Sequence, residues 1–283
     1  MVQLYPFTCA FQGSLPRASF PFMMDGRSVS GTGCVVSSRN AGNMVYSEGL
    51  NSPPRERFYR SLGLEPERVY ACTQIHSRRV LAVNRLSPNR GPEADGMISR
   101  DPSVALSVTV ADCMPVYLYD TGSGGFGLVH SGWRGTGIVL VALDLMASHW
   151  STRPEEVAAV LGPAIRGCCY RVDEERARSF EAEFGGNGGA YPLGGVIRRV
   201  WELPAGNSSG VETGSGTEPD SGNGPGAYAW YLDLPAANAR LLANAGVRNI
   251  AVCEDCTFTD SNFGSFRREG ADYTRMAALA GQL

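Results

Sequence analysis

The strongest constraint on the fold of this chain is a strand–turn–strand pattern in residues 107–136. Two apolar runs there flank a short segment of Gly, Ser and Thr, as the letters SVTVADCMPVYLYDTGSGGFGLVHSGWRGT show. Such a pattern is typical of two antiparallel strands joined by a tight turn, and the closing Gly-containing segment indicates the start of a helix. We centre the turn on Thr121 and Gly122. Cys113 then lies directly opposite His130, with Cβ atoms about 4.5–5.5 Å apart. A slip of one residue would put the two side chains on different faces of the sheet.

A thiol and an imidazole at this distance can bind one metal ion or share a proton. The chain has only three histidines, His76, His130 and His149, so histidine chemistry must use some of these. Catalytic zinc usually has three protein ligands and an open fourth position. His76 is the natural candidate for a third ligand, because it stands in a polar segment between two apolar runs. His149 falls near the end of a predicted helix, where the helix dipole favours a cation without any ligand role.

The remaining pattern predicts a chain that mixes strands and helices. We expect short strands in the first fifty residues and further strands within residues 69–83, 93–99, 104–110, 157–162 and 250–253. Helical spacing of apolar residues predicts helices at residues 53–64, 135–146, 173–184 and 234–245. Two tracts, residues 185–195 and 205–227, lack periodicity, and the second cannot bury enough surface to offset its ordering entropy. We therefore expect a single domain over residues 1–283 with a low-complexity surface insertion at 205–227.

Composition excludes several classes of function. All 25 basic side chains are arginine, so no lysine is present for Schiff-base catalysis or a nucleotide-binding P-loop. The net charge of −3 and the pI near 5.7 provide no electrostatic footprint for nucleic acid or an anionic membrane. No apolar run approaches the ~20 residues that span a bilayer. We expect a cytoplasmic protein whose partner is a small molecule.

The cysteines favour free thiols or metal ligands over disulfides. The eight cysteines lack the dense spacing of a secreted disulfide scaffold. Cys253 and Cys256 have the spacing of a zinc ribbon or a redox pair, but no second such pair accompanies them. Cys168 and Cys169 are adjacent and would point apart in an extended chain. We interpret both pairs as structural thiols.

Two segments are candidates for binding an anion. Gly132 and Gly135 allow a sharp turn into a helix, whose first N–H groups point at anions. Arg134 adds a fixed charge with bidentate geometry for phosphate or carboxylate. Arg267 and Arg268 form a second possible clamp. The alternative for both segments is packing and solvated surface charge, since paired arginines also occur elsewhere in the chain.

Several segments, in this order, resemble the laccase-domain family, formerly called polyphenol oxidases and now regarded as purine nucleoside phosphorylases. The segments are QIHSRRV, ADGMIS, TVADCMPVYLYD, GLVHSGWRGT, LGPAIRGCCYRV, DLPAANARLLANAGV and CTFTDSNFGSFRRE. The resemblance covers residues 57–275 and implies an α/β fold with mixed sheets, a layered α-β-β-α sandwich. It also implies one zinc ion bound by His76, Cys113 and His130.

The same resemblance implies an activity. Family members carry out phosphorolysis of adenosine, inosine, guanosine and methylthioadenosine and hydrolytic deamination of adenosine, while some are linked to editing of peptidoglycan precursors. The expected partners are therefore a purine nucleoside and inorganic phosphate. Our candidate catalytic residues are Cys113, His130 and Asp112, and the candidates for binding substrate or phosphate are Arg134, Gly135, Arg267, Arg268 and Asp95.

Two other hypotheses use the same residues. Cys113 could be the nucleophile and His130 the base of an amide hydrolase that edits peptidoglycan precursors. Alternatively, zinc could stabilise a binding module without turnover. A multicopper oxidase is excluded, because its copper centres need on the order of ten histidines and the chain has three.

Overall fold

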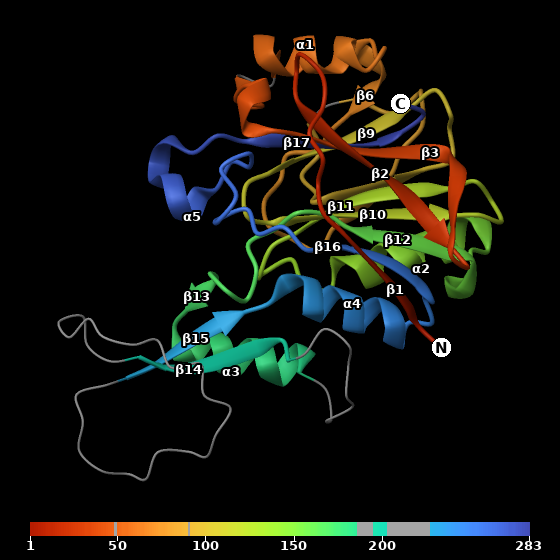
Figure 1. Cartoon of the computed structure of the whole chain (residues 1–283). Coiled ribbons are helices and arrows are strands. Elements are labelled where there is room, and N and C mark those ends of the chain that lie inside the picture. Colours follow the sequence, from red (N-terminus) through yellow and green to blue (C-terminus); the bar gives the residue numbers. More distant parts are fainter. Residues whose placement is uncertain (48–49, 90, 186–194, 203–226) are drawn as a thin grey trace.

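The computed structural model of the protein describes residues 1–47, 50–89, 91–185, 195–202 and 227–283. Two mixed β-sheets lie face to face, and helices cover their outer sides (Figure 1). The expected α/β fold, a layered α-β-β-α sandwich with mixed sheets, is confirmed. Of the expected insertion at residues 205–227, all but Ala227, which begins a strand, lies outside the described residues, as does most of the tract at 185–195.

The larger sheet has seven strands and carries most of the site. Its strands, in spatial order, are β1 (Gln3–Phe7), β16 (Asn249–Cys253), β12 (Val157–Leu161), β10 (Met114–Asp120), β11 (Phe126–Ser131), β8 (Gly96–Ser99) and β7 (Val80–Ala82). Every residue of β10 and β11 is buried. This burial on both faces explains why these two segments read as nearly continuous apolar runs.

The other strands form three further sheets. The five-stranded sheet has the order β2 (Arg17–Met24), β3 (Arg27–Ser37), β17 (Met276–Gly281), β9 (Ala105–Val110) and β6 (Val69–Tyr70). The three-stranded sheet consists of β13 (Arg171–Val172), β15 (Ala227–Leu232) and β14 (Ile197–Glu202), and the two-stranded one of β4 (Tyr46–Ser47) and β5 (Leu50–Asn51). The two strands expected within residues 69–83 exist as β6 and β7, but they belong to different sheets.

The helices form where apolar spacing predicts them. In Figure 1, α1 (Pro53–Ser61) lies above the five-stranded sheet, and α2 (Ile138–Trp150) and α4 (Leu234–Asn244) lie beneath the seven-stranded sheet. Helix α3 (Glu174–Phe184) packs with the three-stranded sheet, and α5 (Phe266–Glu269) is a single turn. Single 3₁₀ turns occupy Arg39–Ala41, Pro66–Arg68, Pro154–Glu156 and Gly270–Asp272. None of the described helices is long and apolar enough to cross a membrane.

The core between the seven-stranded and the five-stranded sheet is built from side chains of both sheets. Its members include Phe20, Leu106, Tyr117, Leu128 and Met276, all of them buried. A second apolar cluster lies between the seven-stranded sheet and the helices α2 and α4. The central strands β10 and β11 are therefore packed on both sides, which makes the sheet a rigid support for side chains at its end.

The expected register of the central hairpin is wrong by two residues. Strand β10 pairs with β11 so that Pro115, and not Cys113, lies opposite His130. The turn is longer than expected, because the Asp120 N–H donates to the Gly125 carbonyl 2.8 Å away and closes the hairpin there. Side chains alternate with a period of two. Cys113 and His130 thus remain on the same face despite the error.

Candidate metal and nucleoside site

The structure brings His76, Cys113 and His130 together. Their ligand atoms, two imidazole nitrogens and one sulfur, lie within 4.8 Å of one another, and the two imidazole centroids are 5.0 Å apart. His76 comes from the loop between β6 and β7, Cys113 directly precedes β10, and His130 lies in β11. Three donors at this spacing can hold a single metal ion.

Asp95 fixes the loop that carries His76. Its carboxylate accepts the backbone N–H groups of Ile75, His76 and Ser77 at 3.2, 3.0 and 2.6 Å. His76 has a φ of 58°, a left-handed conformation that is uncommon for residues other than glycine. The three hydrogen bonds offset this backbone cost and hold the imidazole towards the cluster.

Asp95 also orients His130. A carboxylate oxygen of Asp95 lies 2.9 Å from Nδ1 of His130, and the backbone N–H of His130 donates to the Asp95 carbonyl at 2.7 Å. With Nδ1 engaged, the other ring nitrogen is left for a metal. A carboxylate behind a metal-binding histidine fixes the orientation of the ring and increases its basicity. The fully buried Asp95 thus supports two candidate ligands at once.

The neighbouring charges and hydrogen bonds shift the pKa values of Cys113, His130 and Asp95. Burial by itself would raise the pKa of the Cys113 thiol, but the charge of His130 and hydrogen bonds from His130 and His76 lower it to about 6. Burial would lower the pKa of His130, but the charge of Cys113 and the hydrogen bond to Asp95 raise it to about 9. Despite burial, hydrogen bonds from His130 and Ser77 lower the pKa of Asp95 to about 2. The lowered pKa of Cys113 favours its thiolate, the form that binds metals and attacks electrophiles.

Gly132 leaves room for the cluster. A Cβ atom on this residue would lie 2.8 Å from Sγ of Cys113 and 3.5 Å from Cδ2 of His76. The glycine of the HSGWRG segment is therefore needed for close approach to the thiol and the imidazole. The sequence indicated only a turn at this position.

Asp112 is held rigidly beside Cys113. Its φ is 77°, and its carboxylate accepts the hydroxyl of Thr257 and the backbone N–H of Arg267, both at 2.7 Å. Among the described residues, four other than glycine have positive φ, and two of them, His76 and Asp112, are at this site. Backbone strain of this kind concentrates at functional sites.

The cluster opens into a cavity of about 590 Å³, a size typical of small-molecule sites. Three arginine–aromatic pairs line it. The guanidinium of Arg176 lies 4.4 Å from the ring centroid of Trp133, that of Arg267 lies 5.3 Å from Tyr170, and that of Arg275 lies 4.1 Å from Tyr273. Phe266 adds a further ring. The cavity thus combines a metal-type donor set, flat apolar surfaces and positive charge.

Several of these residues were not predicted from the sequence. Tyr170 and Arg176 lie six residues apart and Arg275 lies about a hundred residues further on, and no local pattern marks any of the three as a binding residue. Gln74 is different, because it stands in the QIHS segment. Its amide donates to the Thr109 carbonyl at 2.9 Å and accepts the Thr109 N–H at 2.7 Å, which anchors the His76 loop to the end of β9.

Four of the predicted binding residues lie away from the cavity walls. Arg134 stacks 5.1 Å from the Trp133 centroid, and it is not among the described residues that line the cavity. Arg268 donates to the carbonyls of Thr257 and Phe258 and so holds a loop in place. Asp95 is buried behind His130.

Gly135 is the fourth of these residues, and its neighbours define the turn. A Cβ atom on it would lie 3.1 Å from the Ser77 carbonyl oxygen, so it packs against the His76 loop. Helix α2 begins at Ile138, after Gly137 with a φ of 101°. The expected helix N-terminus at residues 134–136 is therefore a turn, and the N–H groups of the first helical turn lie further along the chain.

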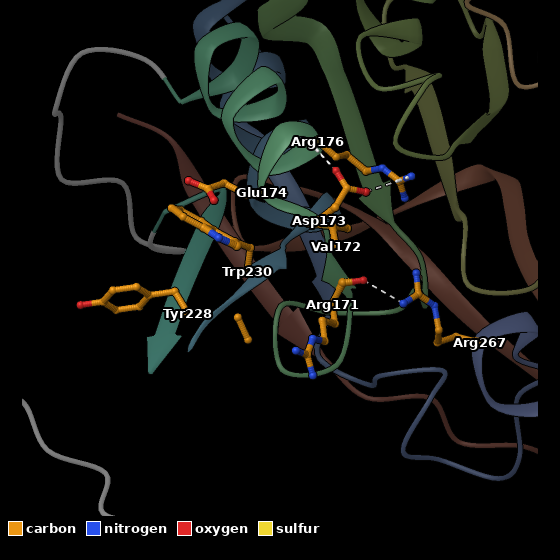
Figure 2. A pocket seen from close by; sticks show the side chains of 9 residues that line it. Arg171, Val172, Asp173, Glu174, Arg176, Tyr228, Trp230 and Arg267 are labelled. Atoms are coloured by element: carbon orange, nitrogen blue, oxygen red, sulfur yellow. Dashed lines mark hydrogen bonds and ion pairs between the residues drawn. The ribbon is translucent and has the colours of Figure 1, made fainter. Parts of the chain in front are cut away.

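A second hollow of about 480 Å³ adjoins the cavity and shares Arg176 and Arg267 with it. Figure 2 shows Arg267 pointing towards the backbone of Arg171, to whose carbonyl it donates at 2.8 Å. On the other side of this hollow, Arg176 forms an ion pair with Asp173 at 3.4 Å. Both arginines are therefore held in place from outside the cavity.

The chain is similar to proteins of known sequence over most of its length. The family described as multi-copper polyphenol oxidoreductase laccase matches residues 51–195 and 207–282. The purine nucleoside phosphorylase YlmD of Geobacillus stearothermophilus is 30% identical over 243 residues, which cover 81% of this chain and 77% of that protein. A purine nucleoside phosphorylase of Mycobacterium bovis is 31% identical over 227 residues, which cover 80% of this chain and 76% of that protein.

Solved structures share the fold. The crystal structure of YlmD from Geobacillus stearothermophilus superposes with a TM-score of 0.72 at 25% identity, covering 96% of this chain and 98% of that one. The Bacillus licheniformis hypothetical protein YfiH has a TM-score of 0.70 at 23% identity, with coverage of 88% and 92%. The second likeness concerns the fold alone.

Proposed function

The chain belongs to the family described as multi-copper polyphenol oxidoreductase laccase, and we propose that it is a zinc-dependent purine nucleoside phosphorylase. One observation carries the proposal. A His–Cys–His cluster opens into a cavity that is lined by aromatic rings and arginines. The names of the relatives from Geobacillus stearothermophilus and Mycobacterium bovis agree with it.

The donor set supports zinc at this cluster. Two imidazoles and one thiolate are the ligand types of catalytic zinc, which keeps a fourth position open. The Asp95 carboxylate behind His130 is the outer support that such a ligand usually has. When bound, zinc would supply Lewis-acid chemistry and activate water. The family is described as multi-copper. This chain has only three histidines, however, and these are too few for a multicopper centre.

The cavity can hold both substrates of a phosphorolysis. Arg176, Arg267 and Arg275 provide cationic forks for phosphate. The rings of Tyr170 and Tyr273 provide faces on which a purine can stack. In the reaction a phosphate oxygen forms a bond to C1′ of the ribose, and the bond from C1′ to the purine nitrogen breaks. The arginines hold the phosphate dianion in position for this attack.

The leaving purine takes up a proton as the glycosidic bond breaks. Asp112 lines the cavity next to Cys113, and its carboxylate is held by Thr257 and the backbone of Arg267. We assign to Asp112 the role of passing this proton to the purine at the cavity wall. Its fixed position suits general acid–base catalysis, which requires the group within hydrogen-bond reach of the substrate.

We extend the proposal to hydrolytic deamination of adenosine at the same site. Water would then replace phosphate as the co-substrate and attack C6 of the purine, which releases ammonia and gives inosine. This reaction does not need the glycosidic bond to break. The two activities can therefore be separated by their products and by their need for phosphate.

The test is a panel of nucleosides with and without phosphate. The purified protein is incubated with inosine, guanosine, methylthioadenosine or adenosine, and products are separated by chromatography. We expect free purine base only when phosphate is present. Adenosine should give inosine without phosphate, and inosine together with free base when phosphate is present. Absence of any product in all conditions would contradict the proposal and favour a binding module.

The amide hydrolase hypothesis has a different signature. It requires Cys113 as a nucleophile, so an electrophile that labels this thiol would abolish the hydrolysis of an amide substrate in protein free of metal. Phosphate-dependent base release that disappears on removal of zinc by a chelator, and returns when zinc is added, would rule that hypothesis out as the main activity.

A further inference from the structure

Three cysteines outside the proposed active site gather their thiols at one point. Cys168 and Cys169 lie in the loop after β12, and Cys256 follows β16. Their Sγ atoms lie within 4.8 Å of one another, and those of Cys168 and Cys169 are 3.2 Å apart. Adjacent residues in an extended chain point their side chains apart, so this convergence is a property of the loop. We call these three residues the thiol cluster.

The backbone holds the thiol cluster in place. Cys256 forms a parallel bridge with Ala164, and the Thr257 N–H donates to the Ala164 carbonyl at 3.1 Å. The Arg166 N–H lies 3.5 Å from Sγ of Cys256. The loop after β12 and the loop after β16 are thus joined at Cys256 and Thr257.

We propose that Cys168, Cys169 and Cys256 form a second metal site, which binds Cu(I) through three thiolates. Soft thiolate ligands select soft ions such as Cu(I). Among the described residues, the thiol cluster contains three sulfur donors. Cu(I) accepts three sulfur ligands, whereas structural zinc almost always takes four ligands. Binding would release a proton from each thiol that is protonated beforehand, without any change in the oxidation state of the ion or of sulfur.

Positive charge near the thiol cluster offsets the negative charge of such a complex. The guanidinium of Arg198 donates to the Gly167 carbonyl at 3.1 and 3.2 Å, next to Cys168. The guanidinium of Arg166 donates to the Cys253 carbonyl at 2.6 Å. Burial would raise the pKa of Cys256, but hydrogen bonds from the backbone N–H groups of Arg166, Phe258 and Thr259 lower it. Burial instead raises the pKa of Cys168 and of Cys169, so Cys256 is the thiol of the three that most readily becomes a thiolate.

Exposure gives the ion a route to the thiol cluster. Cys168 is exposed, Cys169 is half-buried and Cys256 is buried. An ion can therefore reach the outer thiol from solvent and be held by the inner one. The thiol cluster is separate from the proposed active site, because none of its three thiols is among the described residues that line the cavity beside His76, Cys113 and His130.

The test counts bound Cu(I) on the full chain under anaerobic, reducing conditions, by competition with a chromophoric Cu(I) chelator. We expect Cys168→Ser and Cys256→Ser each to bind one Cu(I) fewer than the wild type, or to bind it at least a hundredfold more weakly. Cys72→Ser is the matched control, since Cys72 is a buried thiol outside the metal-type groups, and it should keep the wild-type count. Cys168 is exposed, so its loss should not impair folding.

Two results would overturn the proposal. The first is a Cys168→Ser variant that is folded and binds as much Cu(I), as tightly, as the wild type. The second concerns X-ray absorption of the Cu(I)-loaded Cys113→Ser variant, in which the active-site thiol cannot contribute. A first shell of three sulfurs is expected there, and a shell dominated by nitrogen or oxygen would place the ion elsewhere.

Discussion

A single buried carboxylate, that of Asp95, supports both the His76 loop and the His130 ring. We predict that Asp95→Asn lowers zinc affinity by about 10–100-fold. It should also destabilise the protein by roughly 3 kcal/mol or more, because an amide cannot accept all the hydrogen bonds that the carboxylate accepts. Competition with a zinc chelator and urea unfolding measure the two effects.

Asp120 provides the control for this substitution. It is also buried and hydrogen-bonded, through Ser123 and Thr152, but it lies at the far end of β10 from the cluster. Asp120→Asn should therefore cost stability and leave zinc affinity unchanged. An Asp95→Asn protein that binds zinc as tightly as the Asp120→Asn protein would remove Asp95 from its proposed role.

Arg176 tests the phosphate side of the cavity. We predict that Arg176→Gln raises the KM for phosphate on the order of tenfold or more, because it removes one charge-assisted contact to the anion. Arg178→Gln is the matched control, since Arg178 lies on the same helix, is exposed and pairs with Glu174 at 2.6 Å. Steady-state kinetics with phosphate varied at saturating nucleoside would show the difference. Equal KM values for the two variants would count against phosphate binding at Arg176.

At the scale of elements, the turn between β10 and β11 sets the register of the hairpin. Asp120 accepts the N–H groups of Gly122 and Ser123, and Gly124 has a φ of 74°. The letters TGSGG allow several turns of different length, and all of them satisfy the same local pattern. The sequence therefore predicts the hairpin and the shared face of Cys113 and His130, but not which residues lie opposite each other.

The same turn gives a pH-dependent prediction. Burial would raise the pKa of Asp120, but hydrogen bonds from Ser123, Thr152 and the turn backbone lower it below the ordinary value. A carboxyl group whose pKa is lower in the folded state stabilises the protein above its unfolded pKa, and this contribution is lost as the pH falls through the folded pKa.

We therefore expect the stability difference between wild type and Asp120→Asn to be about 1–3 kcal/mol near pH 7 and to shrink below about pH 4. Urea unfolding of both proteins across this pH range measures it. A difference that stays constant down to the acid limit would mean that ionised Asp120 does not contribute in the way its hydrogen bonds indicate.

For the whole molecule, local pattern predicted the elements better than their assembly. Apolar spacing located α3 and α4, and the caps Asp173 and Asp233 accept N–H groups at their first turns. The order of strands in the sheets is not local, since β1 pairs with β16 and β3 with β17. No periodicity in the chain encodes these long-range pairings.

The residues of the candidate site also fall into those that the sequence predicts and those that it does not. His76, Cys113 and His130 could be selected because histidines are few and the ADC and HSGWRG segments are distinctive. Of the residues around them, Asp112 and Arg267 were also candidates from the sequence and line the cavity. Arg176 was not a candidate, because it reaches the cavity from a peripheral helix, and the candidate Arg268 turns to backbone carbonyls instead. A charged side chain in sequence gives no sign of which partner the fold will supply.

In the proposed function, phosphorolysis depends on zinc that is held by His76, Cys113 and His130. The most direct measurement is zinc content together with phosphate-dependent cleavage of inosine in His76→Ala and His149→Ala. His149 is exposed on α2, so its variant should keep both zinc and activity. His76→Ala should lose stoichiometric zinc and, with it, activity on the order of a hundredfold or more. Retention of zinc by His76→Ala, or full activity in its absence, would contradict the account.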